Sequence, residues 1–399
     1  MTIHNRNIWL GGILVISAGL AAGCKQAPPP APAPQPTTPA AIQIGGEDVM
    51  TLTRKATNSG SKPEFLSVTL LPGRGMNMLQ VTAAIPGKGE IPLLRSPSVQ
   101  EAASQLSGTG RDQQGNLSFS MGGAFLIPYP NRIIGEPSPD GKSVITQWRG
   151  HTLALPANFP SKPGGGGRVV AIHGLITQAK VENLQTQTTA DGQTVTGVIH
   201  AGDFGGHWLS DTDLNFTVAL TGEAVDVSIT AKNVGKEPEP MSVGWHPYFQ
   251  IPSGNRAQAR VHIPASMMAL VNNYSDAFPT GQLKPVKGTE YDYNAPDGVA
   301  LDDHFLDDNF SHLQRTEGAA EVKLIDPASK YGLTVAALSP EIRTVQVYSP
   351  KNATFVAIED QFNYVDPFGK QWKGMDTGMV TLRPGQSVTW KVRLGVFVP

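Results

Sequence analysis

The chain has 399 residues, enough for one large domain or about two to three small ones, and enough to bury a substantial core. Its formal net charge is -2 at pH 7, charged residues make up 16% of the chain, and like charges do not form runs. This charge pattern argues against a partner such as nucleic acid or another polyanion and favours a neutral partner.

The first predicted element is a targeting segment at residues 1–23. An apolar stretch from Ile8 to Leu20 is followed by small residues immediately before Cys24, an arrangement that resembles the lipobox of bacterial lipoproteins. The stretch is short and interrupted by glycine, which disfavours a permanent transmembrane helix. We therefore expect a signal peptide that is removed before Cys24, and a lipid on Cys24 that anchors the protein to a membrane of the cell envelope. The alternative is an ordinary secreted protein in which Cys24 is incidental. Lys25 stands where many inner-membrane lipoproteins carry aspartate, which favours the outer membrane or its periplasmic face over the inner membrane.

Cys24 is the only cysteine of the chain. It cannot form an intramolecular disulfide or a thiolate metal site, so we expect no metal held by thiolates. Residues 24–41 are rich in proline, alanine, threonine and glutamine, a composition that predicts an extended linker. Residues 42–399 show no fixed-period repeat and no change of composition, so they are predicted to form one domain.

Alternation of apolar and polar residues dominates the chain from residue 42 onward. It is clearest at residues 214–220, at 225–230 after a turn at Gly222, and at 390–394 near the C-terminus. No long amphipathic helix stands out, whereas 43 glycines and 33 prolines punctuate many short apolar runs. The sequence therefore predicts an all-β, antiparallel sandwich.

Two charged residues stand in contexts that suit a polar ligand. Arg132 lies in the proline-stiffened segment Pro128-Tyr129-Pro130-Asn131-Arg132-Ile133, and its guanidinium offers a fork of donors. Glu359 ends the apolar run 355–358, so a predicted strand would deliver its carboxylate to a sheet edge, with Gln361 on the same face. A carboxylate there is costly to bury unless it is used or paired. The alternative is a purely structural ion pair between Glu359 and Arg132.

Three of the nine histidines stand out for their neighbours. His246 lies in Gly244-Trp245-His246-Pro247-Tyr248-Phe249, directly after a predicted strand, where aromatic rings could pack a sugar face or fix the imidazole. His173 is followed by Gly174, which allows close approach of the backbone. His304 lies in an acidic loop, and the remaining six histidines are given no role.

Taken together and in order, these segments resemble the aldose 1-epimerase, or galactose mutarotase, family. The resemblance covers the chain from about Leu66 to the C-terminus, and it implies the antiparallel β-supersandwich of that family. Its most specific elements are Tyr129-Pro130-Asn131-Arg132-Ile133, Asn158, His173-Gly174, His246-Pro247-Tyr248-Phe249, an Asp-Asp-x-Phe segment, Gln346-Val347-Tyr348 and Glu359-Asp360-Gln361.

The resemblance also implies roles for individual residues. Glu359 would be the general base and His246 the general acid, while Arg132, Asn131 and His173 would bind sugar hydroxyls or the ring oxygen. These residue types suit the reaction, because exchanging anomers requires one group to take the proton of the C1 hydroxyl while another protonates the ring oxygen. No cofactor is expected.

The family also has a substrate-binding aspartate, for which this sequence offers two candidates. Asp307 is the better match because a leucine follows the segment at the expected place, and Asp302 is the alternative. Two departures from the family pattern leave the sugar open. Phe125-Leu126-Ile127-Pro128 replaces a glycine- and arginine-rich approach, and residues 362–368 replace a Pro-Asp-Ala-like turn.

Three other functions compete with an epimerase that acts on a free aldose. A glycoside hydrolase would need two carboxylates flanking the bond, such as Glu359 with Asp307 or Asp302. A sugar-binding lipoprotein without catalysis would keep the aromatic residues and Arg132 only. A related enzyme for hexose 6-phosphates is disfavoured because the sequence shows no basic cluster for phosphate. The sequence leaves the natural sugar and the oligomeric state open.

Overall fold

The computed structural model describes residues 41–57, 60–160 and 166–399. The predicted signal peptide, Cys24 and nearly all of the predicted linker lie outside the described residues. Within the described part, no helix has the length and apolar character needed to cross a membrane.

The segments with alternating residues form strands, as predicted. They are β16 (Thr212–Leu220), β17 (Ala224–Asn233) and β30 (Ser387–Phe397). β16 and β17 pair antiparallel, with Val218 opposite Val227, and buried residues alternate with less buried ones along both strands. One face of each strand thus packs into the core while the other faces outward, which is what the alternation requires.

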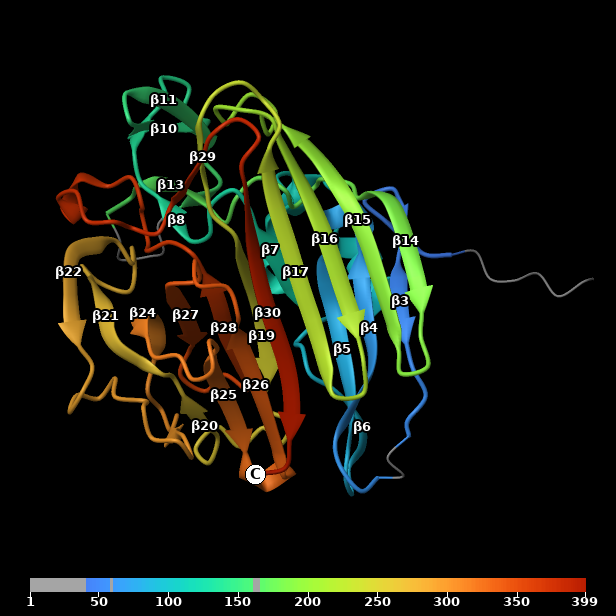
Figure 1. Cartoon of the computed structure of the whole chain (residues 1–399). Coiled ribbons are helices and arrows are strands. Elements are labelled where there is room, and N and C mark those ends of the chain that lie inside the picture. Colours follow the sequence, from blue (N-terminus) through green and yellow to red (C-terminus); the bar gives the residue numbers. More distant parts are fainter. Residues whose placement is uncertain (1–40, 58–59, 161–165) are drawn as a thin grey trace, which may run out of the picture. The chain divides into compact units, whose positions relative to one another are not determined.

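One large sheet carries His246, Glu359 and Asp307 of the candidate site. Among the described residues it has eleven strands, which Figure 1 shows behind the second sheet. In spatial order they are β22 (Pro279–Pro285), β21 (Ala265–Val271), β24 (Leu306–Leu313), β27 (Thr344–Ser349), β28 (Phe355–Gln361), β19 (Gly244–Gln250), β7 (Gly123–Leu126), β5 (Asn77–Ile85), β4 (Glu64–Leu71) and β3 (Met50–Thr53), with β6 (Gly89–Pro92) paired to β5.

A second large sheet packs against the first, in front of it in Figure 1, and has nine strands in the described part. In spatial order they are β14 (Glu182–Thr188), β15 (Gln193–Gly202), β16, β17, β30, β26 (Tyr331–Ala337), β25 (Ala320–Asp326), β20 (Arg260–His262) and β23 (Val299–Ala300).

Smaller elements complete the fold. Two small sheets have three strands each: β12 (Phe159–Pro160) with β13 (Val169–Ile172) and β8 (Arg132–Ile133), and β9 (Glu136–Pro137) with β10 (Ser143–Trp148) and β11 (His151–Pro156). Two others have two strands each: β1 (Gln43–Ile44) with β2 (Glu47–Asp48), and β18 (Glu239–Met241) with β29 (Val380–Leu382). The helical elements are α1 (Val99–Gln105) and the 3-10 turns η1 (Pro72–Arg74), η2 (Gly110–Asp112), η3 (Asn116–Ser120), η4 (Pro327–Ser329) and η5 (Lys370–Trp372). α1 is the only α-helix of the described residues. It begins with a capping box in which Ser98 and Glu101 satisfy each other's free backbone N–H groups.

Aromatic side chains fill the space between the two large sheets. Phe125 of β7 packs edge-on against Phe216 of β16 and Trp390 of β30, with ring centroids 5.6 and 6.2 Å apart. The Trp390 indole N–H donates to the backbone oxygen of Asp360 in β28 at 3.0 Å. The two sheets therefore share one apolar core, and the prediction of an all-β antiparallel sandwich is confirmed.

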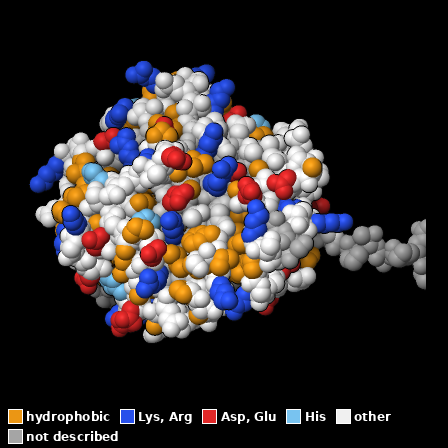
Figure 2. All heavy atoms as spheres, turned by 60° about the horizontal axis from the view of Figure 1, so that its bottom comes forward, with side chains coloured by type: hydrophobic (Ala, Val, Ile, Leu, Met, Phe, Trp, Pro, Cys, Tyr) orange, Lys and Arg blue, Asp and Glu red, His pale blue; other side chains and the backbone are white. Residues whose placement is uncertain are grey.

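Charged side chains are mixed on the surface. On the face presented in Figure 2, basic and acidic side chains are interspersed and neither forms a large area of one sign. This distribution matches the small net charge of the chain, -2.

Candidate active site

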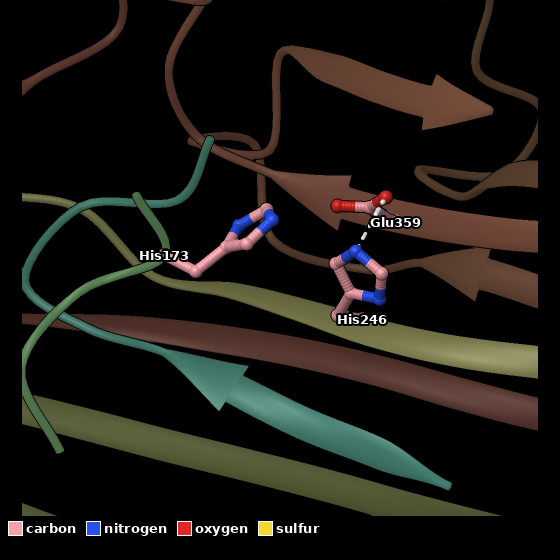
Figure 3. Close-up of side chains that lie close together, drawn as sticks. All are labelled: His173, His246 and Glu359. Atoms are coloured by element: carbon pink, nitrogen blue, oxygen red, sulfur yellow. Dashed lines mark ion pairs between the residues drawn. The ribbon is translucent and has the colours of Figure 1, made fainter. Parts of the chain in front are cut away.

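His246 and Glu359 lie opposite each other on the neighbouring strands β19 and β28. The register pairs Tyr248 with Ala357. His246 lies two residues before Tyr248, and Glu359 lies two residues after Ala357. Because the strands are antiparallel, His246 and Glu359 are therefore opposite each other and on the same face of the sheet. Their side chains meet with 3.3 Å between His246 Nε2 and Glu359 Oε1 (Figure 3).

The position of His246 corrects the sequence prediction, which placed it after a strand. It lies inside β19. Trp245 and Phe249 are fully buried in the main core, whereas His246 and Tyr248 line a cavity on the other face. The period-2 pattern of a strand is present, but residues 244–249 are all buried and Pro247 interrupts the run, so the pattern is hidden in the sequence.

His173 reaches the same place from a loop. It follows β13 and has φ 62°, and the next residue, Gly174, has φ 80°. A side chain on Gly174 would place its Cβ 2.3 Å from the Ile127 carbonyl oxygen, so only glycine fits there. The His173 N–H donates to the Asn131 carbonyl at 2.9 Å. The ring of His173 then meets the ring of His246 edge-on, with centroids 4.7 Å apart (Figure 3).

Four polar side chains form a closed ring of contacts beside this pair. Arg132 Nη1 donates to Asn131 Oδ1 at 3.0 Å, and Asn131 Nδ2 donates to Gln346 Oε1 at 3.0 Å. Gln346 Nε2 donates to Asp307 Oδ1 at 2.9 Å, and Asp307 Oδ2 lies 3.7 Å from Arg132 Nη2. The guanidinium is thus paired with Asp307, and the interpretation of Glu359 as its ion-pair partner is wrong.

The backbone around Arg132 is fixed by Asp366. The Asp366 N–H donates to the Arg132 carbonyl at 2.8 Å, and its carboxylate accepts from the Ile134 N–H at 2.9 Å. Burial raises the pKa of Asp366 to about 6. The segment that departs from the family pattern after Glu359 therefore still holds the arginine in place.

These side chains line a cavity of about 320 Å³ between the eleven-stranded sheet and the elements β12, β13 and η3. That volume is at the small end of the roughly 300–1,000 Å³ typical of small-molecule sites. The lining residues are Asn116, Phe119, Ser120, Asn131, Arg132, Phe159, Ile172, His173, His246, Tyr248, Asp307, Gln346, Tyr348 and Glu359.

The two candidate aspartates are placed differently. Asp307 lies in β24, is buried and lines the cavity. Asp302 is exposed in a turn with φ 44° and is not part of the lining. Asn158, an element of the family resemblance, also lies outside the lining, and its side chain instead bonds both backbone groups of Ile172, next to His173. Its place is therefore structural.

Burial favours uncharged forms of the central residues. It raises the pKa of Glu359 well above its usual value, with a smaller contribution in the same direction from the negative charge of Asp307. Burial lowers the pKa of His246 to about 4 and holds the pKa of His173 well below its usual value, where His246 and Arg132 add to the effect. Burial therefore favours the form in which Glu359 holds a proton and His246 is neutral, so that their contact carries one proton that the two groups can exchange.

His173, His246 and Glu359 also offer a donor set that zinc uses, with ligand atoms within 4.8 Å of one another. Histidines that bind a metal usually donate their second ring N–H to an acceptor. Here Nδ1 of both His173 and His246 is buried without a hydrogen-bond partner among the described residues. Arg132 places a positive charge close to both histidines, and this charge would repel a metal cation. The three residues can approach a metal, but they lack the support of a resident metal centre.

Several lining residues were not predicted as site residues. Gln346 and Tyr348 share one face of β27. They belong to a segment that carries the family resemblance, but the sequence analysis gave them no role. Phe119 and Phe159 come from a 3-10 turn and a two-residue strand. No local pattern marks such short elements, so only the fold reveals these two rings.

Comparisons with known proteins found one matching family model and a set of solved structures that share the fold. The sequence model of the aldose 1-epimerase family matches residues 107–395. Solved structures with the same fold include a galactose mutarotase-like protein from Clostridium acetobutylicum (18% identity, TM-score 0.65, covering 88% of this chain and 99% of that one). They also include an aldose epimerase homologue from C. elegans (16% identity, TM-score 0.64, 88% and 99%) and a galactose 1-epimerase from Lactobacillus acidophilus (16% identity, TM-score 0.58, 88% and 99%). No curated protein sequence matches the chain.

Proposed function

This chain belongs to the aldose 1-epimerase family, and we propose that it interconverts the α and β anomers of a free, neutral aldose. The observation that supports this function best is the contact of 3.3 Å between His246 and Glu359 at the bottom of a cavity of sugar size. A base and an acid that share one proton are what anomer exchange requires.

The reaction can be written with these two groups alone. Glu359, as carboxylate, takes the proton of the C1 hydroxyl while His246, as imidazolium, gives a proton to the ring oxygen. The bond between C1 and the ring oxygen breaks, and the C1 oxygen becomes the aldehyde oxygen. After rotation about C1–C2 the same steps run in reverse on the other face, and both groups regain their starting protonation. The carboxylate–imidazolium form arises when the shared proton moves from Glu359 to His246 across their contact.

The remaining polar residues position the sugar. Arg132 and Asn131 offer N–H donors, Asp307 offers carboxylate oxygens, and His173 offers a ring nitrogen, all of which suit hydroxyl groups. Because contacts within the protein already orient these groups, they contribute to holding the sugar near the acid and base rather than to the proton transfers. Phe119 and the other apolar lining residues can pack against the C–H face of the ring.

The structure gives less support to the competing functions. A glycoside hydrolase needs a second carboxylate free to act on the bond, but Asp307 is engaged with Arg132 and Gln346. A hexose 6-phosphate needs cationic groups, and Arg132 is the only lysine or arginine among the described residues that line the cavity. Its pairing with Asp307 leaves little positive charge for a phosphate.

The test is polarimetry with the purified full chain. We expect the chain to accelerate the change in optical rotation of freshly dissolved α-D-glucose or α-D-galactose above the rate in buffer. No acceleration with any aldose of a common panel would overturn the proposal. Release of reducing sugar from aryl glycosides would indicate a hydrolase, and saturable sugar binding without either reaction would indicate a binding protein.

We also propose where the protein acts, on the sequence alone. Residues 1–23 would be a signal peptide, Cys24 would carry the lipid, and residues 24–41 would hold the domain at 42–399 away from the membrane. The outer membrane or its periplasmic face is the proposed place. Sugars would then be interconverted in the cell envelope.

A further inference from the structure

Among the cavity residues that the eleven-stranded sheet supplies, exposure changes steadily along the strands. At one end, Gln361 and Thr344 are fully buried. At the next position along the strands lie the catalytic candidates, with Glu359 2% exposed. One position further, Tyr248 is 9% exposed and Tyr348 is half-buried. Exposure thus rises from the acid–base pair toward the two tyrosines, which mark the mouth of the cavity.

Further aromatic rings continue the floor beyond this mouth. Phe355 lies next along β28, with its ring centroid 5.1 Å from that of Tyr248 and 6.2 Å from that of Tyr348. Phe305, just before β24, meets Tyr348 edge-on at 6.4 Å. Phe355 and Phe305 are half-buried and are not part of the cavity lining. We call Phe305, Phe355 and the adjoining Arg95 the outer shelf.

Arg95 adds a polar group to this shelf. Its backbone N–H donates to the Tyr248 carbonyl at 2.7 Å, which fixes its place at the mouth. Its guanidinium lies 5.0 Å from the centroid of the Phe355 ring, and the residue is exposed. No carboxylate of the described residues forms an ion pair with it. The shelf therefore offers aromatic surface and N–H donors side by side, the combination that binds sugar rings.

We propose that the outer shelf binds a second sugar ring, so that the preferred substrate is the reducing end of a disaccharide or longer saccharide joined through O4. This inference rests on the proposed function. The acid and base require C1 and the ring oxygen beside Glu359 and His246, at the buried end. C4 lies across the ring from C1, so a sugar linked through O4 leaves through the mouth. The cavity of about 320 Å³ holds one ring, and the next ring lies over the shelf.

The test compares glucose with lactose, whose reducing end is a glucose residue linked through O4. Mutarotation kinetics and titration calorimetry are measured with the purified full chain. We expect lactose to show a KM and a Kd about three- to tenfold lower than those of glucose, the range expected for one aromatic contact. Melibiose, whose glucose is linked through O6, should not share this advantage.

Variants assign the effect to the shelf. Arg95→Ala and Phe355→Ala should remove the advantage of lactose and leave glucose kinetics within about twofold of the unmodified chain. Arg95 is exposed, so its variant tests the shelf even if Phe355→Ala folds poorly. The matched control is Arg149→Ala, since Arg149 also lies over an aromatic ring, at 4.8 Å from the centroid of Trp148, but outside the cavity lining.

Two results would overturn the inference. The first is that the chain turns over glucose but binds lactose no more tightly than glucose. The second is that Arg95→Ala changes the KM and Kd of both sugars equally. Failure of the proposed function itself looks different, because then neither sugar would be turned over. Calorimetry would still measure binding of lactose against glucose in that case.

Discussion

Glu359 and Asp360 are neighbours in β28 whose side chains lie on opposite faces of the sheet. Glu359 lines the cavity beside His246. Asp360 is fully buried, and neither of its carboxylate oxygens has a hydrogen-bond partner among the described residues. Two adjacent carboxyl groups thus have different environments, and the chain offers an internal control for the catalytic proposal.

Glu359→Gln should abolish the acceleration of mutarotation. The substitution keeps the shape of the side chain but removes the base, and loss of such a group costs about 10²- to 10⁴-fold in rate. The measurement is polarimetry, with circular dichroism to show that the fold is intact. Asp360→Asn is the matched control and should retain activity, because its side chain faces away from the cavity. Equal losses in the two variants would contradict the assignment of Glu359.

The pH profile of kcat/KM should show an acid limb near pH 4. His246, with its pKa lowered to about 4 by burial, gains a proton below that value while Glu359 is also protonated, and no base is left. Since burial raises the pKa of Glu359, the pair keeps its single proton from about pH 4 up to that raised pKa. Activity should fall only above the raised pKa of Glu359, when no acid is left. The buffer rate is subtracted at each pH. An acid limb near 6.5, the usual pKa of histidine, would contradict the burial argument.

Asp307→Asn should raise KM about tenfold or more, because charge-assisted hydrogen bonds contribute about 1.5–3 kcal/mol. It removes the charge that faces Arg132 and one acceptor for sugar hydroxyls. Asp302→Asn is the control and should leave both kcat and KM unchanged, since Asp302 is exposed outside the cavity lining. The reverse result would show that Asp302 binds the substrate.

The strands could be predicted where their period-2 pattern is visible. Residues 214–220 and 225–230 pair with each other along a hairpin, so a local pattern and a short turn suffice. The strand around His246 was missed because it is buried on both faces and contains Pro247.

The arrangement of the site could not be predicted from local patterns. Asn131 and Gln346 share a hydrogen bond although 215 residues separate them in sequence. Which side chains meet is decided by the order and register of strands from distant parts of the chain. The sequence motifs supplied Arg132, His246 and Glu359 as candidates, and the sheet supplied their distances.

Cys24→Ser should release the protein from the membrane. A thiol is needed for the lipid, so the variant should move from the membrane fraction to the soluble fraction of the cells that export it. Immunoblots of the two fractions measure the change. Mutarotase activity per molecule should stay the same, because the cavity lies in the domain. An unchanged membrane fraction would show that Cys24 is not the anchor.

Asp360→Asn should stabilise the fold increasingly as the pH rises. Burial raises the pKa of Asp360 well above 3.8, so the folded chain holds a proton that the unfolded chain has released. The contribution of Asp360 to the free energy of unfolding is fully present below the pKa of the unfolded chain. It is lost as the pH rises toward the pKa of the folded chain, by up to about 1.4 kcal/mol per pH unit. Asparagine has no such proton. Urea unfolding of both proteins at pH 5 and pH 8 should therefore show a difference in the free energy of unfolding that grows with pH in favour of the variant. The pKa of Glu359 is raised as well, but Glu359 is present in both proteins, so its contribution cancels from the comparison. A difference that stays constant with pH would mean that Asp360 ionises in the folded chain as it does in the unfolded one.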